Sequence, residues 1–101
     1  MEKGLYNITS ATTTTLIDFY KGKGSISSIR LTNAHASTDV TVDLFLEDTS
    51  GTKCYILKTD IPGKSSILLE NVSFNNSVLA LKITTAGAGL GGSTPLSIII
   101  K

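Results

Sequence analysis

Apolar and polar residues alternate along several stretches of the chain, most regularly between Asp39 and Asp48. The sequence DVTVDLFLED places aliphatic residues on one parity and mainly polar residues on the other, and Phe45 is the exception. Successive side chains of a strand point to opposite faces, so this period of two is typical of a strand with one face buried. A shift of one residue would expose the whole aliphatic side, so the pattern also predicts which face is buried.

Further strand patterns alternate with turn signals. We predict strands over residues 12–20, 25–33, 53–58, 65–70, 78–85 and 95–101, and residues 1–10 form either a first strand or an arm. The Gly-containing turn at 48–51 makes residues 40–48 and 53–58 a hairpin. No segment has a helical period, so the chain is predicted to be an all-β, antiparallel two-sheet sandwich of about seven or eight strands. Immunoglobulin-like and jelly-roll topologies both fit.

Details of the pattern predict local features. Ile26 has the opposite parity to Ile29 and Leu31, so a bulge near Ser27-Ser28 would bring all of them to one face. Pro62-Gly63 predicts a turn in which the glycine takes a positive φ. The apolar run 98–100 predicts cover on both faces. Val72 and Phe74 are expected to plug one end of the core. The predicted core comprises Ile29, Leu31, Val42, Leu44, Leu46, Ile56, Ile67, Leu69, Leu79, Leu81, Ile83 and Ile98.

Composition narrows the class of protein. The 101 residues make one domain, 41% of them are hydrophobic, and the formal charge is +1 with scattered Lys and Arg, which argues against a nucleic-acid partner. The sequence shows neither a signal peptide nor an apolar run long enough for a membrane helix, so we expect cytosolic synthesis and no membrane partner. Cys54 is the only cysteine, and we expect it to be a small buried hydrophobe.

The candidate catalytic and binding motifs lack the structural context that their chemistry requires. Residues 87–92 match the glycine spacing of a dinucleotide loop, but a proline and an Ile-rich strand follow where that motif needs a helix. His35, Ser37 and Asp39 share one short connection, whereas triad members must converge from a supported pocket. No Cys or His spacing suits zinc, and the acidic residues of the 39–48 strand diverge too far for calcium. We therefore predict a non-enzymatic protein with no catalytic, cofactor-binding or metal-binding residues.

The candidate protein-interface residues are aromatic side chains on outer faces or beside the turn at 21–24, the two lysines of that turn, and two aliphatic residues near the end of the sequence. Aromatic residues on an outer face usually cap a neighbouring strand, but they also serve as anchors in protein interfaces. The set comprises Phe19, Tyr20, Lys21, Lys23, Phe45, Tyr55, Leu90 and Ile99.

Several segments together carry a family resemblance. ISSIRLTN at 26–33, the Thr32-Asn33-x-His35 motif, VTVDLFL at 40–46 and SILLENVSFNNSVLALKITT at 66–85 resemble small β-sandwich virion proteins of tailed bacteriophages, notably marine and cyanobacterial phages. The likeness spans residues 6–101, and its motifs build a sandwich without contributing catalytic residues.

The resemblance implies a structural protein of the virion, assembled in the host cytoplasm. Capsid decoration, in which the chain binds the shell of major capsid protein, is the first reading, and a neck, tail or fibre-attachment component is the second. Self-association, for example as a trimer, and strand pairing through residues 98–100 are further expectations. An Ig-like adhesion or glycan-binding module is the alternative from another class.

Overall fold

The computed structural model describes residues 4–20, 25–87, 90 and 94–101. Its strands are β1 (Gly4–Ile8), β2 (Thr12–Ile17), β3 (Ser25–Asn33), β4 (Val40–Asp48), β5 (Lys53–Ile61), β6 (Ser66–Ser73), β7 (Leu79–Ala86) and β8 (Leu96–Ile100). The first residues of the described chain therefore form a strand and not an arm. The part of the chain that is described contains no helix able to cross a membrane.

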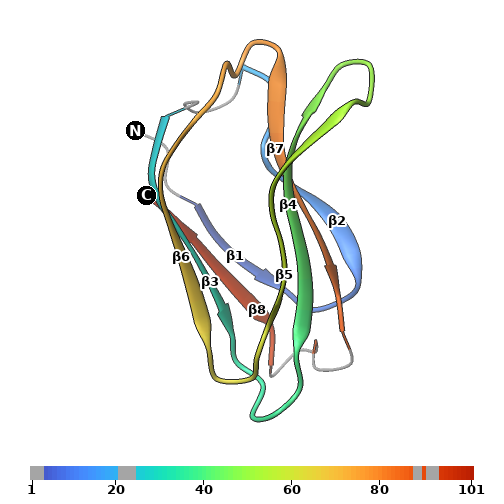
Figure 1. Cartoon of the computed structure of the whole chain (residues 1–101), viewed down its shortest axis with the longest axis vertical. Helices are drawn as coiled ribbons and strands as arrows, with labels where there is room; N and C mark the ends of the chain where they lie inside the picture. Colours follow the sequence, from blue (N-terminus) through green and yellow to red (C-terminus); the bar gives the residue numbers. More distant parts are fainter. Residues whose placement is uncertain (1–3, 21–24, 88–89, 91–93) are drawn as a thin grey trace.

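Two four-stranded antiparallel sheets pack face to face, which confirms the predicted fold class (Figure 1). Sheet A has the order β1-β8-β3-β6 and sheet B has the order β2-β7-β4-β5. The pairing is nested, because β1 pairs with β8, β2 with β7, β3 with β6 and β4 with β5. This is the arrangement of an eight-stranded jelly roll, and it differs from the ABED and CFG sheets of immunoglobulin domains.

The C-terminal strand β8 lies inside sheet A, hydrogen-bonded to β1 on one side and to β3 on the other. The expectation that residues 98–100 pair with a strand of another molecule is therefore wrong, since both edges of β8 are occupied. Ile98 and Ile100 are buried in the core, and Ile99 points to the outer face, where it is half-buried. No second layer covers Ile99 within the described residues, so the expected cover on both faces is also wrong.

The core lies between the two sheets and is entirely aliphatic at its centre. Its buried members are Ile8, Leu16, Ile17, Ile26, Ile29, Leu31, Val40, Val42, Leu44, Ile61, Leu81, Ile83, Leu96, Ile98 and Ile100. Of the remaining predicted core residues, Leu46, Ile56, Ile67 and Leu69 pack against this cluster from its rim, and Leu79 is half-buried. Val72 and Phe74 also pack against it, as expected for plugs at one end.

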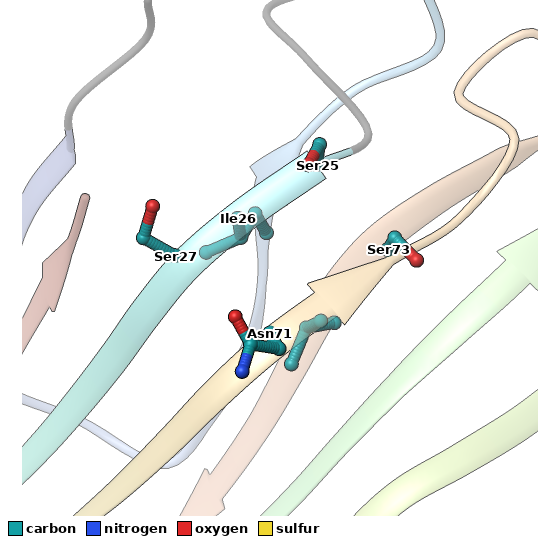
Figure 2. Close-up of a pocket in the computed structure, with 6 residues that line it drawn as sticks. Ser25, Ile26, Ser27, Asn71 and Ser73 are labelled. Atoms are coloured by element: carbon teal, nitrogen blue, oxygen red, sulfur yellow. The ribbon is translucent and has the colours of Figure 1, made fainter.

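The predicted bulge at Ser27-Ser28 is present. The backbone N–H groups of Ser27 and Ser28 both donate to the carbonyl of Lys101, at 2.9 and 3.4 Å. Ile26 is thereby buried with Ile29. The neighbouring strand β6 has a matching irregularity at Asn71, whose φ is 59°. As a result, the pairs between β3 and β6 keep the same register before and after the bulge. Figure 2 shows Ser27 and Asn71 beside each other on these two strands.

A second bulge lies in the edge strand β5, where the register against β4 shifts between Leu44 and Phe45. Leu44 pairs with Leu57 and Phe45 pairs with Tyr55, so Ile56 is the extra residue. Ile56 and Leu57 both pack against the core. The bulge therefore changes the parity of β5 and turns Tyr55 to the outer face.

The turn at Pro62-Gly63 forms, but the positive φ falls on Lys64, at 62°, and not on the glycine. Gly63 is required for a different reason. A Cβ atom at this position would lie 2.7 Å from both the carbonyl oxygen of His35 and the backbone nitrogen of Ser37. The absence of a side chain lets the β5–β6 turn pack directly on the β3–β4 connection.

Candidate interaction surface

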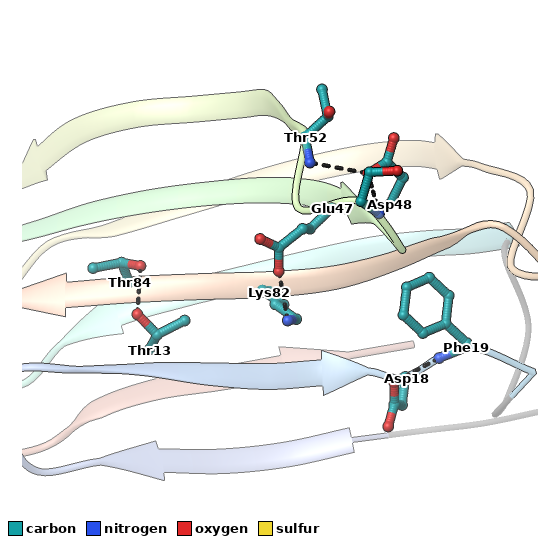
Figure 3. A network of polar contacts seen from close by, with 9 residues as sticks. Thr13, Asp18, Phe19, Glu47, Asp48, Thr52, Lys82 and Thr84 are labelled. Atoms are coloured by element: carbon teal, nitrogen blue, oxygen red, sulfur yellow. Dashed lines mark hydrogen bonds and ion pairs between the residues drawn. The ribbon is translucent and has the colours of Figure 1, made fainter.

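The outer face of sheet B satisfies its own charges. Lys58 forms an ion pair with Asp43 at 3.4 Å, and Lys82 forms one with Glu47 at 2.6 Å. Figure 3 shows the Lys82–Glu47 contact, together with the hydrogen bond between the hydroxyls of Thr13 and Thr84 on β2 and β7. These contacts join side chains on neighbouring strands, so four charged residues of this face have a partner of opposite sign within it.

Phe45 is only 1% exposed, which contradicts its predicted role as an exposed interface anchor. It lies on the outer face of sheet B, but the ring of Tyr55 packs on it at a centroid distance of 5.6 Å and the Lys53 ammonium lies 5.0 Å from its ring centroid. The β5 bulge explains the error, because it carries Tyr55 across to Phe45. Tyr55 remains 47% exposed, although the Lys58 ammonium lies 4.2 Å from its ring centroid.

The outer face of sheet A carries a different kind of surface. Cross-strand pairing aligns Leu5 of β1 with Ile99 of β8, Ile99 with Arg30 of β3, and Arg30 with Leu68 of β6. We call these four residues the sheet A row. Leu5 is 80% exposed and Leu68 is 47% exposed, so two large aliphatic side chains face solvent at the two ends of the row.

Small polar side chains lie beside the sheet A row. The adjacent cross-strand positions are Asn7, Ser97, Thr32 and Ser66. The Ser97 hydroxyl and the Asn7 side-chain oxygen are 2.9 Å apart. Short side chains therefore flank a row in which three of the four residues are aliphatic. A patch of exposed aliphatic residues with few charges is typical of the central part of protein interfaces.

The other candidate contact residues are not gathered into one site. Tyr20 is 78% exposed, and its backbone N–H donates to the carbonyl of Asn76 at 3.0 Å, which places it beside the β6–β7 corner. Phe19 is half-buried. Leu90 is half-buried and packs against the core. Lys21 and Lys23 lie outside the described residues.

The loop around His35 is held in place by hydrogen bonds from the side chains of Asn33 and His35. Asn33 is 1% exposed, and its amide nitrogen donates to the carbonyls of Thr38 and Ile61, each at 2.8 Å. The His35 Nδ1 atom accepts hydrogen bonds from the backbone N–H groups of Ser37 and Thr38, at 3.1 and 3.0 Å. The imidazole thus supports its own loop, and no hydrogen bond joins it to Asp39 in the described structure.

Other chemical features are sparse in the described residues. Cys54 is exposed on β5, contrary to the expected burial, because it lies beyond the bulge near the end of an edge strand. No group of three or more His, Cys, Asp and Glu side chains within the described ranges could hold a metal ion. An open hollow of about 170 Å³ lies at the paired irregularity of β3 and β6 and is lined by residues 25–27 and 71–73. Figure 2 shows side chains that line it.

The sheet A row could not be found from the sequence, although Ile99 belonged to the candidate set. Leu5, Arg30 and Leu68 stand in strands far apart along the chain, and only the strand order brings them together. The only sequence signal is that each has the parity opposite to the buried residues of its strand.

No protein-family model matches this chain, and no curated protein matches its sequence. Among solved structures, the chain is similar to the Anabaena sensory rhodopsin transducer, with a TM-score of 0.43, 9% identity, and coverage of 100% of this chain and 96% of the other. It is also similar to the structure of infectious bursal disease virus Gt strain, with a TM-score of 0.35, 13% identity, and coverage of 99% and 28%. At these TM-scores neither similarity bears on function.

Proposed function

We propose that this chain is a non-enzymatic structural protein of a phage virion that binds neighbouring virion proteins through the outer face of sheet A. Capsid decoration, by attachment to the shell of major capsid protein, is the first form of the proposal. The observation that carries it is the sheet A row, in which exposed aliphatic side chains cross an otherwise small and polar face.

The two outer faces differ in what it would cost to remove them from water. Covering sheet B would dehydrate the paired charges of Lys58, Asp43, Lys82 and Glu47, and buried ion pairs recover that cost only with excellent geometry. Covering sheet A would bury Leu5 and Leu68, and full burial of a leucine side chain contributes about 2 kcal/mol. The stem of Arg30 can lie along apolar surface while its guanidinium stays in water. A partner is therefore expected on sheet A.

The sheet edges support contact through a face in preference to strand addition. Three of the four edge strands are irregular, while β1 pairs with β8 in regular register. The register of β2 shifts between Thr15 and Ile17, β5 is bulged between its pairs to Leu44 and Phe45, and β6 is irregular at Asn71. Bulges on edge strands discourage the pairing of another strand. The jelly-roll arrangement is used by viral capsid domains and also by lectins, so it fits a virion role without requiring it.

The test is the copy number of the protein in purified virions of the phage that encodes it, measured by quantitative mass spectrometry against the major capsid protein. Decoration predicts a copy number comparable with that of the major capsid protein. A small fixed number per virion would instead favour the neck, tail or fibre alternative. Absence from virions, or binding to a glycan array by the isolated protein, would contradict the proposal.

A further inference from the structure

We propose that the outer edge of β1 binds an extended segment of a virion partner, which adds a further strand to sheet A. The inference rests on the proposed function and deepens it, because it names the kind of segment that the partner of sheet A contributes. That segment is an extended strand with an aliphatic side chain beside Leu5.

The edge of β1 is a regular template for another strand. β1 stands at the end of sheet A, and its residues pair with β8 without a shift of register. In an edge strand, alternate residues direct their backbone N–H and C=O groups away from the sheet, where an extended chain can pair with them. The 5 residues of β1 present about 16 Å of such an edge.

The other edge strands have features that oppose such pairing. β2 and β5 contain register shifts, and β6 has a positive φ at Asn71. At the β2 shift, the carbonyl of Leu16 already accepts a hydrogen bond from the Tyr6 hydroxyl at 2.6 Å. β1 has no register shift, no charged residue and no proline, which are devices that protect natural edge strands. Among the edges of the described strands, β1 is therefore the one suited to accept a strand.

The side chains of β1 specify the chemistry of the added strand. Leu5 is 80% exposed on the outer face, with Ile99 of β8 on one side and no described strand on the other. A residue opposite Leu5 on an added strand would lie about 5 Å away and would continue the sheet A row. An aliphatic side chain there would cover Leu5. The main-chain hydrogen bonds would then supply affinity, and this side chain would supply specificity.

The expected occupant is a segment of a partner and not the β1 strand of a second copy. A contact confined to an edge of 5 residues would fall far below the area of about 800 Å² per partner that stable complexes bury. A partner that covers the outer face of sheet A buries the sheet A row in addition to pairing with β1. Leu5 belongs to both surfaces, so the edge of β1 continues the contact face of the proposed function.

Hydrogen–deuterium exchange of the backbone amides, compared between purified virions and the isolated protein, tests the inference. The amides of β1 that point away from β8 should exchange at least about tenfold more slowly in virions, because the added strand accepts their hydrogen bonds. β6 is the matched control, since it is the other edge of sheet A and carries Leu68 of the same row. Its outward amides should slow by less than about threefold, because a partner that only covers the face pairs with neither edge.

Unchanged exchange at β1, or equal slowing of β1 and β6, would overturn the inference. Either result leaves the virion assignment standing, because that assignment is judged by copy number in virions. Absence of the protein from virions would overturn both.

A pair of substitutions tests the aliphatic neighbour of Leu5. The side chains introduced by Leu5→Val and Leu5→Thr have the same shape, and only the first keeps an aliphatic contact. The protection of the β1 amides in virions should be about threefold lower for Leu5→Thr than for Leu5→Val. Equal protection in the two variants would contradict the aliphatic side chain assigned to the added strand.

Discussion

Replacement of Asn33 by Ala should be one of the most destabilising polar substitutions in the described chain. The Asn33 side chain is buried and makes three hydrogen bonds, two as donor to the carbonyls of Thr38 and Ile61 and one as acceptor from the backbone N–H of His35. Through them it holds the β3–β4 connection against the end of β5. Alanine leaves these backbone groups unpaired, including the carbonyl of Ile61 in a buried position.

The magnitude follows from these contacts. Each hydrogen bond contributes about 1 kcal/mol net, and a buried group left without a partner costs about 1 to 3 kcal/mol, so we expect a loss of about 3 to 4 kcal/mol. Domains of this size have a total stability of about 5 to 15 kcal/mol, so the variant should still fold in the absence of denaturant. In urea, with a slope of about 1.5 kcal/mol/M, the midpoint should fall by about 2 M.

Urea unfolding followed by circular dichroism provides the assay, with Asn7→Ala as the control. Asn7 is exposed and makes one surface contact with Ser97, so its loss should cost no more than about 0.5 kcal/mol. Asn33→Ala at a cost below about 1 kcal/mol would refute the structural role given to this side chain.

The charged analogue adds a pH test. Asn33→Asp places a carboxylate where two backbone carbonyls need a donor, so burial and these oxygens should raise the pKa of the new carboxyl above its unfolded value. Because the carboxyl has a higher pKa in the folded state than in the unfolded state, the protein is fully destabilised at pH values above the folded pKa. The destabilisation decreases as pH falls through the folded pKa, because the protonated acid can donate one hydrogen bond. Asn33→Asp should therefore recover stability on acidification relative to Asn33→Ala. A constant difference between the two variants across pH would contradict this reasoning.

Two further stability predictions follow from the packing. Phe45→Ala should lower the free energy of unfolding by about 3 kcal/mol because it removes a fully buried ring. Tyr55→Ala should lower it by about 1 kcal/mol because about half of that ring is exposed to solvent. Equal melting temperatures for the two variants would contradict the burial of Phe45. Gly63→Ala should destabilise the protein by more than about 1 kcal/mol, since the new Cβ would meet the backbone of His35. Gly51→Ala meets no atom within 4 Å and should cost only about 1 kcal/mol for its φ of 88°, so a larger loss in thermal unfolding at Gly51 than at Gly63 would refute the close approach.

Local patterns predicted the strands and much of the core because alternation is a local property. The parity conflict between Ile26 and Ile29 was sufficient to predict a bulge at Ser27-Ser28. The compensating irregularity at Asn71 was not predictable, because it depends on β6 being the neighbour of β3. The choice between jelly-roll and immunoglobulin topology also depends on which strands are neighbours in each sheet, because the order of strands along the chain is compatible with both.

The candidate contact residues were harder to predict because exposure depends on neighbours in space. Phe45 has an outward parity, yet it is buried by Tyr55, which the extra residue Ile56 moves to that face. Leu90 belongs to a Gly-rich stretch that looks exposed in sequence but packs on the core. Conversely, Leu5 stood in a segment too irregular to assign, and its exposure on sheet A became evident only with the pairing of β1 and β8.

The central claim is that the protein contacts its virion partners through the outer face of sheet A. Competition between variants for incorporation into virions tests this claim most directly. Tagged wild-type, Leu68→Arg and Tyr55→Arg proteins would each be expressed during infection beside the untagged protein, and the ratio of tagged to untagged copies measured in purified virions. We predict that Leu68→Arg is depleted from virions at least about tenfold relative to Tyr55→Arg, because only Leu68 belongs to the contacting face. Equal incorporation of the two variants, or preferential loss of Tyr55→Arg, would contradict the assignment of function to this face.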